Sequence, residues 1–208
     1  MGRVATRRWW IALTVLALLL LGATRFWPTV QRIEIIGAQH HEPRTIANLA
    51  RVTHDDPLLW ITRWRVGDLM RDPWIRQARV TRHWPDTITI AVWERVPYAR
   101  AGTRIDDTVW AEDGTVLPGA TIAERVPLPV VTGWGEDRTV EALKMLRLLQ
   151  DRQPKVIQYS PLGFEIVLSD IVIQTPDQAA LERQWAAVER SREGRLAIYP
   201  WGVSVADE

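Results

Sequence analysis

An uncharged apolar run near the N-terminus, from Trp9 to Ala23, limits the possible architectures more than any other segment. One helical crossing of a bilayer core requires about 20 apolar residues. The run reaches that length at Trp27 if the side chain of Arg25 extends toward the lipid headgroups. Bulky aromatic residues at both ends are typical of the membrane–water interface. The sequence therefore predicts a transmembrane helix over residues 9–27.

A cleaved signal peptide is the alternative interpretation of this run, since its apolar core would span about 7–15 residues. Cleavage needs small residues at alternate positions, and only Gly22 and Ala23 precede bulky side chains. We therefore predict an uncleaved anchor. Three arginines precede the apolar run: Arg3, Arg7 and Arg8. Because positive charge remains on the cytoplasmic side, we expect residues 1–8 to form a cytoplasmic tail and everything after Pro28 to lie outside the cytoplasm.

Residues 28–97 show the apolar periodicities of a small α+β domain. A first strand ends at Gly37, two helices follow, and two further strands are joined by Pro85 and Asp86. The last strand alternates isoleucine and valine with threonine and alanine, and Pro97 stops any regular ladder after it. The order strand, helix, helix, strand, strand predicts a three-stranded sheet with two helices on one face.

Residues 98–208 contain short strands, with glycine or proline at nearly every junction. One amphipathic helix is predicted within residues 137–153, with its apolar stripe at Leu143, Met145, Leu146 and Leu149. A second follows Thr175-Pro176-Asp177-Gln178, which has the pattern of a capping box. The segment RLAIYPWGVSV is expected to form one last strand. We predict a mixed, mostly antiparallel β domain with two helices.

The composition excludes several classes of function. With 26 Lys and Arg against 25 Asp and Glu, the chain is nearly neutral and lacks the basic surplus of nucleic-acid-binding proteins. Cysteine is absent, which excludes disulfides, thiolate nucleophiles and cysteine-based zinc sites. No glycine-rich phosphate loop or serine elbow motif is present. We therefore expect no cofactor and no small-molecule substrate.

The remaining polar candidates favour structural roles. The four histidines have no metal-ligand spacing, and we interpret them as solvated loop residues: His40, His41, His54 and His83. The acid pairs at residues 55–56 and 106–107 stand in turns, where aspartate bonds its own backbone. Some of the 12 tryptophans suggest a carbohydrate or single-strand platform. Four of them fall on predicted core faces, which favours packing: Trp60, Trp64, Trp74 and Trp185. The sequence indicates no active site and no metal site.

The order of the parts resembles the FtsQ/DivIB family of bacterial cell-division proteins. After the anchor, VQRIEIIGAQ is similar to the family's opening strand, with its final glycine. Residues Asp72 to Ala99 resemble the pattern that closes a POTRA domain: Pro-Trp, a basic strand, Trp-Pro, an alternating strand and Glu-Arg-x-Pro. IDDTVWAEDGTVLP and the terminal AIYPWGVSV are similar to two segments of the family's second domain. The resemblance implies a POTRA domain over residues 28–97 and an FtsQ-type β domain over residues 98–208.

The resemblance also implies a function. In the family, a non-enzymatic scaffold in the cell membrane, single-pass and of type II, recruits division proteins at the septum. Its second domain binds an FtsB/DivIC-type subunit, itself in complex with an FtsL-type protein. The implied partner-binding residues lie on the last strand: Tyr199, Trp201, Gly202 and Val203. Glu94, Arg95 and Pro97 are then expected at the joint between the two domains, where Glu94 and Arg95 can pair.

Two other functions stay open at this point. One is a POTRA-type chaperone or accessory of protein transport, which would usually have several POTRA repeats or a downstream barrel. The other is a membrane-tethered hydrolase of the cell wall, which would need an acid or nucleophile constellation that the sequence does not indicate.

Overall fold

The computed structural model describes residues 2–23, 28–61, 64–102, 108–191 and 194–206, and the chain divides into two compact units, Met1–Arg95 and Val96–Glu208. Helix α1 spans Gly2–Ala23, and its large apolar side chains between Trp9 and Leu21 are exposed where the structure describes them. Within the described ranges, no helix is both long and apolar enough to cross a membrane. Residues 24–27 of the predicted span lie outside the described residues.

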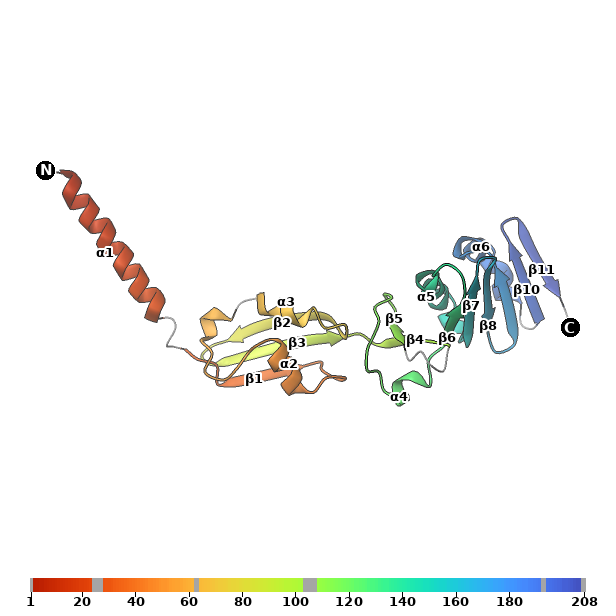
Figure 1. Ribbon diagram of the computed structural model, residues 1–208, viewed down its shortest axis with the longest axis horizontal. Helices are drawn as coiled ribbons and strands as arrows, with labels where there is room; N and C mark the ends of the chain where they lie inside the picture. Colours follow the sequence, from red (N-terminus) through yellow and green to blue (C-terminus); the bar gives the residue numbers. More distant parts are fainter. Residues whose placement is uncertain (1, 24–27, 62–63, 103–107, 192–193, 207–208) are drawn as a thin grey trace. The chain divides into compact units, whose positions relative to one another are not determined.

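The first unit contains the predicted three-stranded sheet (Figure 1). Its elements after α1 are β1 (Arg32–Ile36), α2 (Pro43–Leu49), the 3-10 helix η1 (Leu58–Trp60), α3 (Trp64–Leu69), β2 (Ile75–His83) and β3 (Thr87–Glu94). Strand β3 is central, parallel to β1 and antiparallel to β2. The predicted order of strand, helix, helix, strand and strand is therefore confirmed.

The alternating side chains of β3 form the centre of this unit's core. Ile88, Ile90 and Val92 are buried, together with Ile46 of α2 and Leu69 of α3. Burying one such aliphatic side chain stabilises a fold by about 1.5–3 kcal/mol. The side chains between them on β3, which point to the other face, are partly or well exposed. The sheet thus packs against its helices with one face only.

The predicted core positions of the tryptophans are only partly correct. Trp74 is buried, and Trp185 of the second unit packs partly buried against its core. Trp60 is half exposed, so its prediction was wrong. The reason is that η1 is a single short turn and Leu58 takes its buried position. The side chain of Trp64 lies outside the described residues.

Gly37, directly after β1, is a position that only glycine fits. Its φ is +88°, and a Cβ atom there would collide with the carbonyl oxygen of Val92. We expect Gly37→Ala to lower the free energy of unfolding of the first unit by about 2 kcal/mol or more, because backbone strain and a backbone clash add. Gly67→Ala is the matched control, since Gly67 lies within α3 and a Cβ there meets nothing within 4 Å. Equal denaturation midpoints for the two variants would contradict this account of Gly37.

The second unit is built on one eight-stranded sheet of order β11-β10-β9-β8-β7-β6-β4-β5. Its elements are β4 (Pro97–Ala101), β5 (Val109–Ala111), α4 (Ile122–Arg125), β6 (Val130–Gly133), α5 (Thr139–Leu148), η2 (Gln150–Arg152), β7 (Val156–Ser160), β8 (Gly163–Val167), β9 (Ile171–Thr175), α6 (Gln178–Arg183), α7 (Trp185–Arg190), β10 (Gly194–Tyr199) and β11 (Gly202–Ala206). The pairs β4–β5, β7–β8, β8–β9 and β10–β11 are antiparallel, and β4–β6, β6–β7 and β9–β10 are parallel.

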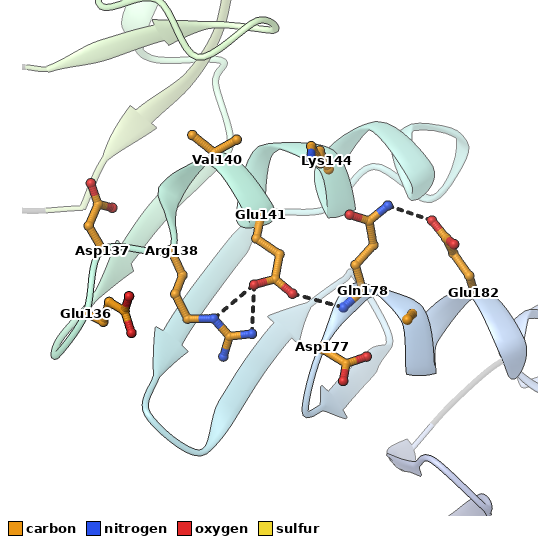
Figure 2. A pocket seen from close by; sticks show the side chains of 10 residues that line it. Glu136, Asp137, Arg138, Val140, Glu141, Lys144, Asp177, Gln178 and Glu182 are labelled. Carbon is orange, nitrogen blue, oxygen red and sulfur yellow. Dashed lines mark hydrogen bonds and ion pairs between the residues drawn. The ribbon is translucent and has the colours of Figure 1, made fainter.

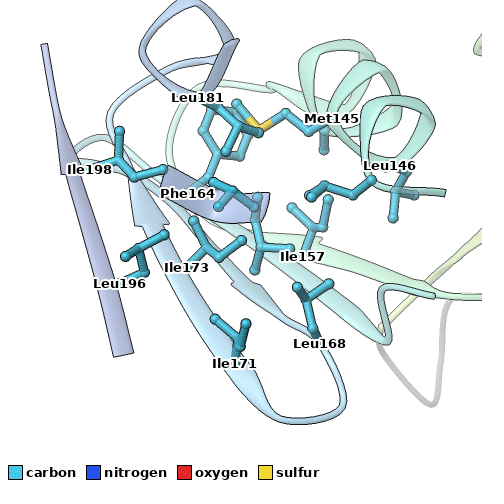
Figure 3. Close-up of a cluster of buried hydrophobic side chains, with 14 of the residues drawn as sticks. Met145, Leu146, Ile157, Phe164, Leu168, Ile171, Ile173, Leu181, Leu196 and Ile198 are labelled. Carbon is cyan, nitrogen blue, oxygen red and sulfur yellow. The ribbon is translucent and has the colours of Figure 1, made fainter. Parts of the chain in front are cut away.

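Helices cover one face of this sheet over its central strands (Figure 3). The predicted apolar stripe of α5 is buried, and its residues pack on Ile157, Phe164 and Ile173 of the central strands. Leu181 of α6 extends the same cluster toward Ile198 of β10. Helices α5, α6 and α7 all contribute to this one cluster, and the strand residues that alternate with its core positions face the other side of the sheet.

The prediction of two helices in this unit was wrong, because the described residues contain α4 to α7. Helix α4 begins at a capping box that the analysis of the sequence missed: the Thr121 hydroxyl accepts from Glu124 N, and the Glu124 carboxylate accepts from Thr121 N. The predicted second helix is divided at Gln184 into α6 and α7.

The start of α6 also differs from the prediction. Thr175 pairs with Phe164 in the sheet, so the first helical turn begins later than predicted. Asp177 is the N-cap instead, and its carboxylate accepts from Ala180 N at 2.7 Å.

The expected single last strand is a hairpin. Strand β10 ends at Tyr199, the chain turns through Pro200 and Trp201, and β11 returns antiparallel to it. Proline interrupts the ladder at the turn, so an apolar run that suggested one strand forms two. Strand β10 is consequently internal, between β9 and β11, and the edge of the sheet is β11.

Candidate functional site

Strand β11 is the first candidate site because it ends the strand order of the large sheet. Its inner side pairs with β10 in a five-residue register from Tyr199↔Gly202 to Arg195↔Ala206. Along the part of the chain that the structure describes, no further strand follows it in the sheet. In the opposite edge strand, β5, Trp110 forms an isolated antiparallel bridge with Val116. An edge strand presents unpaired N–H and C=O groups that can bind an added strand.

Two exposed aromatic rings stand at the turn that leads into this edge. The rings of Tyr199 and Trp201 stack at a centroid distance of 5.5 Å and an interplanar angle of 14°. Tyr199 is 44% exposed and Trp201 is 83% exposed. Neither ring belongs to the buried cluster of the unit. This exposure disfavours a role in sealing the end of the core, and it leaves a large apolar surface beside β11.

The two other predicted partner-binding residues begin β11. Gly202 pairs with Tyr199, and a Cβ atom built on Gly202 would meet nothing within 4 Å. Val203 pairs with Ile198 and packs partly buried against the core. The structure therefore brings all four predicted residues together at one end of the hairpin. Their role in binding a partner stays a prediction.

Glu94, at the end of β3, is the centre of the second candidate site. Its carboxylate accepts three backbone N–H groups from the loop between β1 and α2: Gln39 at 2.7 Å, His40 at 2.6 Å and His41 at 3.2 Å. These three hydrogen bonds fasten the loop between β1 and α2 to the end of β3. The sequence suggested a joint residue here, but it gave no signal for a carboxylate that holds a loop more than fifty residues earlier.

Arg95 holds a different loop of the same unit. Its Nη1 donates to the carbonyl oxygens of Pro73 and Ile75, both at 2.9 Å, and its backbone N–H donates to Trp74 O. These hydrogen bonds, like those of Glu94, join parts of the first unit. Pro97 follows as the first residue of β4. The expected pairing of Glu94 with Arg95 at a domain interface stays a prediction.

The interpretation of His40 and His41 as solvated loop residues was wrong. Both are half buried, because the Glu94 carboxylate draws their backbone inward. The His40 ring stacks on Trp74 at 3.4 Å, and His41 Nε2 lies 3.2 Å from Asp72 Oδ2. His54 and His83 are exposed, as expected. In the ranges that the structure covers, no three side chains of metal-binding type are placed to share an ion.

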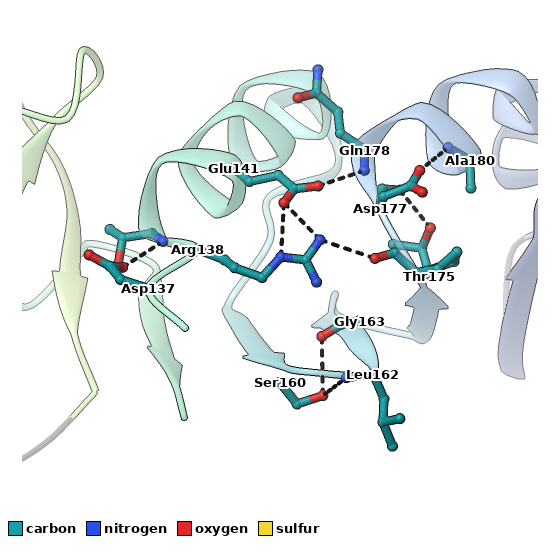
Figure 4. A network of polar contacts seen from close by, with 12 residues as sticks. Asp137, Arg138, Glu141, Ser160, Leu162, Gly163, Thr175, Asp177, Gln178 and Ala180 are labelled. Carbon is teal, nitrogen blue, oxygen red and sulfur yellow. Dashed lines mark hydrogen bonds and ion pairs between the residues drawn. The ribbon is translucent and has the colours of Figure 1, made fainter. Parts of the chain in front are cut away.

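A polar pocket of about 630 Å³ lies where the N-termini of α5 and α6 meet (Figure 2). Four of its carboxylates accept hydrogen bonds: Asp137, Glu141, Asp177 and Glu182. Glu141 accepts from Arg138 Nε and Nη2 at 2.9 and 2.7 Å and from Gln178 N at 3.1 Å. Arg138 Nη2 also donates to Pro176 O, which ties α5 to the connection before α6 (Figure 4).

Two other acids of this pocket, Asp137 and Asp177, serve the starts of the helices. Asp177 caps α6, and Asp137 Oδ1 accepts from Thr139 N at 2.9 Å. Hydrogen bonds from the Thr139 side chain and backbone lower the pKa of Asp137. A carboxyl group with a lowered pKa is ionised at neutral pH and is a poor general acid. These hydrogen bonds thus fix the starts of α5 and α6.

The sequence is similar to a known domain family and to several known proteins. Residues 29–95 match the family model for the POTRA domain, FtsQ-type. The cell division protein FtsQ of Salinibacter ruber (strain DSM 13855 / M31) is 39% identical over 90 residues, which cover 42% of this chain and 35% of that protein. FtsQ of Caulobacter vibrioides (strain NA1000 / CB15N) is 26% identical over 166 residues, or 77% of this chain and 54% of that protein.

The resemblance to the FtsQ/DivIB family of bacterial cell-division proteins is confirmed by the POTRA match and by these FtsQ relatives. FtsQ of Rhodothermus marinus (strain ATCC 43812 / DSM 4252 / R-10) is a further relative, 38% identical over 102 residues that cover 47% of this chain and 37% of that protein. The chain thus spans between 35% and 54% of the length of these FtsQ relatives. The matched POTRA region ends at Arg95, where the first compact unit also ends.

Proposed function

We propose that this chain is a non-enzymatic scaffold of the bacterial division machinery. Its second unit binds an FtsB/DivIC-type subunit, in complex with an FtsL-type protein, outside the cytoplasm. The bound segment adds a strand to β11. Main-chain hydrogen bonds along such an edge supply affinity, and adjacent side-chain contacts supply specificity.

The open edge at β11 beside the exposed Tyr199–Trp201 stack is the observation that carries this proposal. Tyrosine and tryptophan are frequent energetic centres of protein interfaces, because they bury much apolar area with few rotatable bonds. The use of Glu141 and Asp177 to hold the start of α6 supports structural roles for these two carboxylates.

We further propose that residues 9–27 anchor the chain in the cell membrane as a single-pass type II protein at the division septum. The support is the charge-free sequence from Trp9 to Ala23 and the exposure of its described large side chains around the helix axis. A helix that is apolar all round requires an apolar environment. Arginines at the N-terminal end place that end in the cytoplasm.

A cysteine cross-linking experiment tests strand addition at β11. The chain has no cysteine of its own, so Ser204→Cys introduces one thiol on an exposed position of β11. Single cysteines are placed along the interacting segment of the FtsB/DivIC-type subunit. Side chains of paired strands face each other at every second residue. We expect disulfides at alternate partner positions only.

Glu112→Cys provides the control, since Glu112 is exposed directly after the opposite edge strand, β5. It should form no specific disulfide with the same partner cysteines. Cross-links from Glu112→Cys but none from Ser204→Cys, in a complex that still forms, would place the partner on another surface. Cross-links at consecutive partner positions would contradict an added strand.

A further inference from the structure

Three large apolar side chains are exposed at one end of the POTRA sheet. Leu59 is 37% exposed, Trp60 is 49% exposed and Trp84 is 62% exposed. Leu59 and Trp60 belong to η1, whereas Trp84 lies in the turn between β2 and β3. Arg82 Nη1 at the end of β2 donates to Leu59 O at 3.2 Å, so the two segments lie at the same end of the sheet. We call Leu59, Trp60 and Trp84 the tip surface.

The chain enters the POTRA fold at this same end. Pro28 O accepts from Leu58 N at 2.9 Å, which places the first described residue after the anchor next to η1. Gln31 N and Arg32 N donate to Asp86 O in the turn that carries Trp84. Strand β2 ends and strands β1 and β3 begin at this end of the sheet (Figure 1). The tip surface therefore surrounds the entry of the chain.

The connection to the anchor is short. Only residues 24–27 separate Ala23, the last residue of α1, from Pro28. Five residue steps of fully extended chain span at most about 18 Å. A membrane that holds α1 is therefore within reach of the tip surface, whatever path the connection takes. The far end of the same sheet, where Trp93 is exposed on β3, has no such constraint.

The chemistry of the tip surface suits the headgroup layer of a bilayer. Tryptophan is enriched at that depth, because its ring is apolar and its N–H remains hydrogen-bonded. Arg82 and His83 are exposed beside the turn. The half-buried acids next to them are bonded internally: Asp56 Oδ2 accepts from Thr53 N, and Asp86 Oδ1 accepts from the Thr87 hydroxyl. Asp55, three residues before η1, is exposed and is an unfavourable charge there.

We propose that the tip surface inserts into the headgroup layer of the bilayer that holds α1. The POTRA domain then rests against the membrane with the start of its sheet instead of moving freely on its short connection. This inference rests on the proposed membrane anchor. It adds a second, reversible membrane contact made by the folded domain itself.

A depth-resolved fluorescence experiment tests this contact in the full chain, reconstituted into phosphatidylcholine vesicles. His83→Cys next to Trp84 and Gln77→Cys near the start of β2 each receive one environment-sensitive fluorophore, since both sites are exposed and the chain has no other cysteine. A headgroup-labelled quencher lipid is then added. We expect several-fold stronger quenching at position 83 than at position 77.

Replacing Trp60 and Trp84 together by alanine separates insertion from tethering. The short connection is unchanged in this variant, so quenching at position 83 should fall to the level of position 77 only if the tip surface inserts. Equal quenching at both positions, or no change in the double variant, would overturn the proposal. Quenching that requires anionic lipid would overturn it too, because the contact would then depend on charge rather than on the tryptophans.

The anchor itself is checked in the same vesicles by extraction at alkaline pH. If the chain resists extraction but shows no quenching at position 83, the proposed tip contact alone is contradicted. If the chain is extracted, the proposed membrane anchor is contradicted, and so is the tip contact that rests on it. Trp93→Ala serves as the matched control, since it removes an exposed tryptophan at the other end of the sheet and should leave quenching at position 83 unchanged.

Discussion

Replacing both Tyr199 and Trp201 by alanine should weaken binding of the FtsB/DivIC-type subunit by at least about 2 kcal/mol, or roughly 30-fold in Kd. The two rings stack on each other and are largely exposed, so their apolar area is available to a partner. For the same reason, the unfolding midpoint of the isolated chain should hardly change. Binding is measured by titration of the full chain with its partner, and stability by chemical denaturation.

The control for this experiment is Trp134→Ala, since Trp134 is also an exposed aromatic residue of the second unit but lies just after β6, far from β11 in the strand order. That variant should bind at full affinity. If Tyr199→Ala/Trp201→Ala folds normally and binds as tightly as Trp134→Ala, the aromatic stack is not the anchor of the interface. A large loss of stability in the double variant would instead assign the rings to the core.

Glu94→Ala should lower the free energy of unfolding of the first unit by about 3 kcal/mol, because three backbone amides lose a charged acceptor. The loss of stability should appear in the loop between β1 and α2 as well as in the unfolding of the whole unit. We expect the amides of Gln39 and His40 to lose protection in hydrogen exchange before the sheet does. The transition of the second unit should not move.

Two variants separate this effect from general loss of charge. Glu34→Ala removes an exposed carboxylate from the same sheet and should leave the stability within about 0.5 kcal/mol of the unmodified chain. Arg95→Ala removes two hydrogen bonds to carbonyl oxygens that water can partly replace, so we expect a smaller cost of about 1–2 kcal/mol. Unchanged exchange at Gln39 and His40 in Glu94→Ala would contradict the role assigned to the carboxylate.

The elements of the POTRA fold were predictable because their signals are local. Alternation at Ile88, Ile90 and Val92 gives a strand with one buried face, and Trp84-Pro85-Asp86 marks the turn before it. The two-residue turn at Pro200-Trp201 was missed for the opposite reason. It has none of the Asn-Gly or Asp-Gly signals of a tight hairpin, and apolar residues on both sides make the pattern continuous.

The candidate sites could be located from the sequence, but their contacts could not. The Glu94 carboxylate accepts hydrogen bonds from backbone N–H groups. Because nearly every residue has a backbone N–H, the sequence does not indicate which ones bind the carboxylate. The histidines were misinterpreted as a result, since nothing in His40-His41 indicates that their loop closes over Trp74. The exposure of Tyr199 and Trp201 likewise depends on which parts of the sheet the helices cover. The periodicity of apolar residues in the sequence does not give that information.

The strand order has a mechanical consequence for a chain held at both ends. Strand β4 directly follows the first unit in sequence, whereas β11 is the edge strand at the opposite side of the sheet. A pulling force between the anchor and a partner bound at β11 would therefore act on every pair of neighbouring strands from β11 to β4. The β10–β11 ladder has five residue pairs, but β4–β6 has two, Arg100↔Val130 and Ala101↔Val131. Under load, the sheet should therefore part first between β4 and β6, and the β10–β11 hairpin would stay intact.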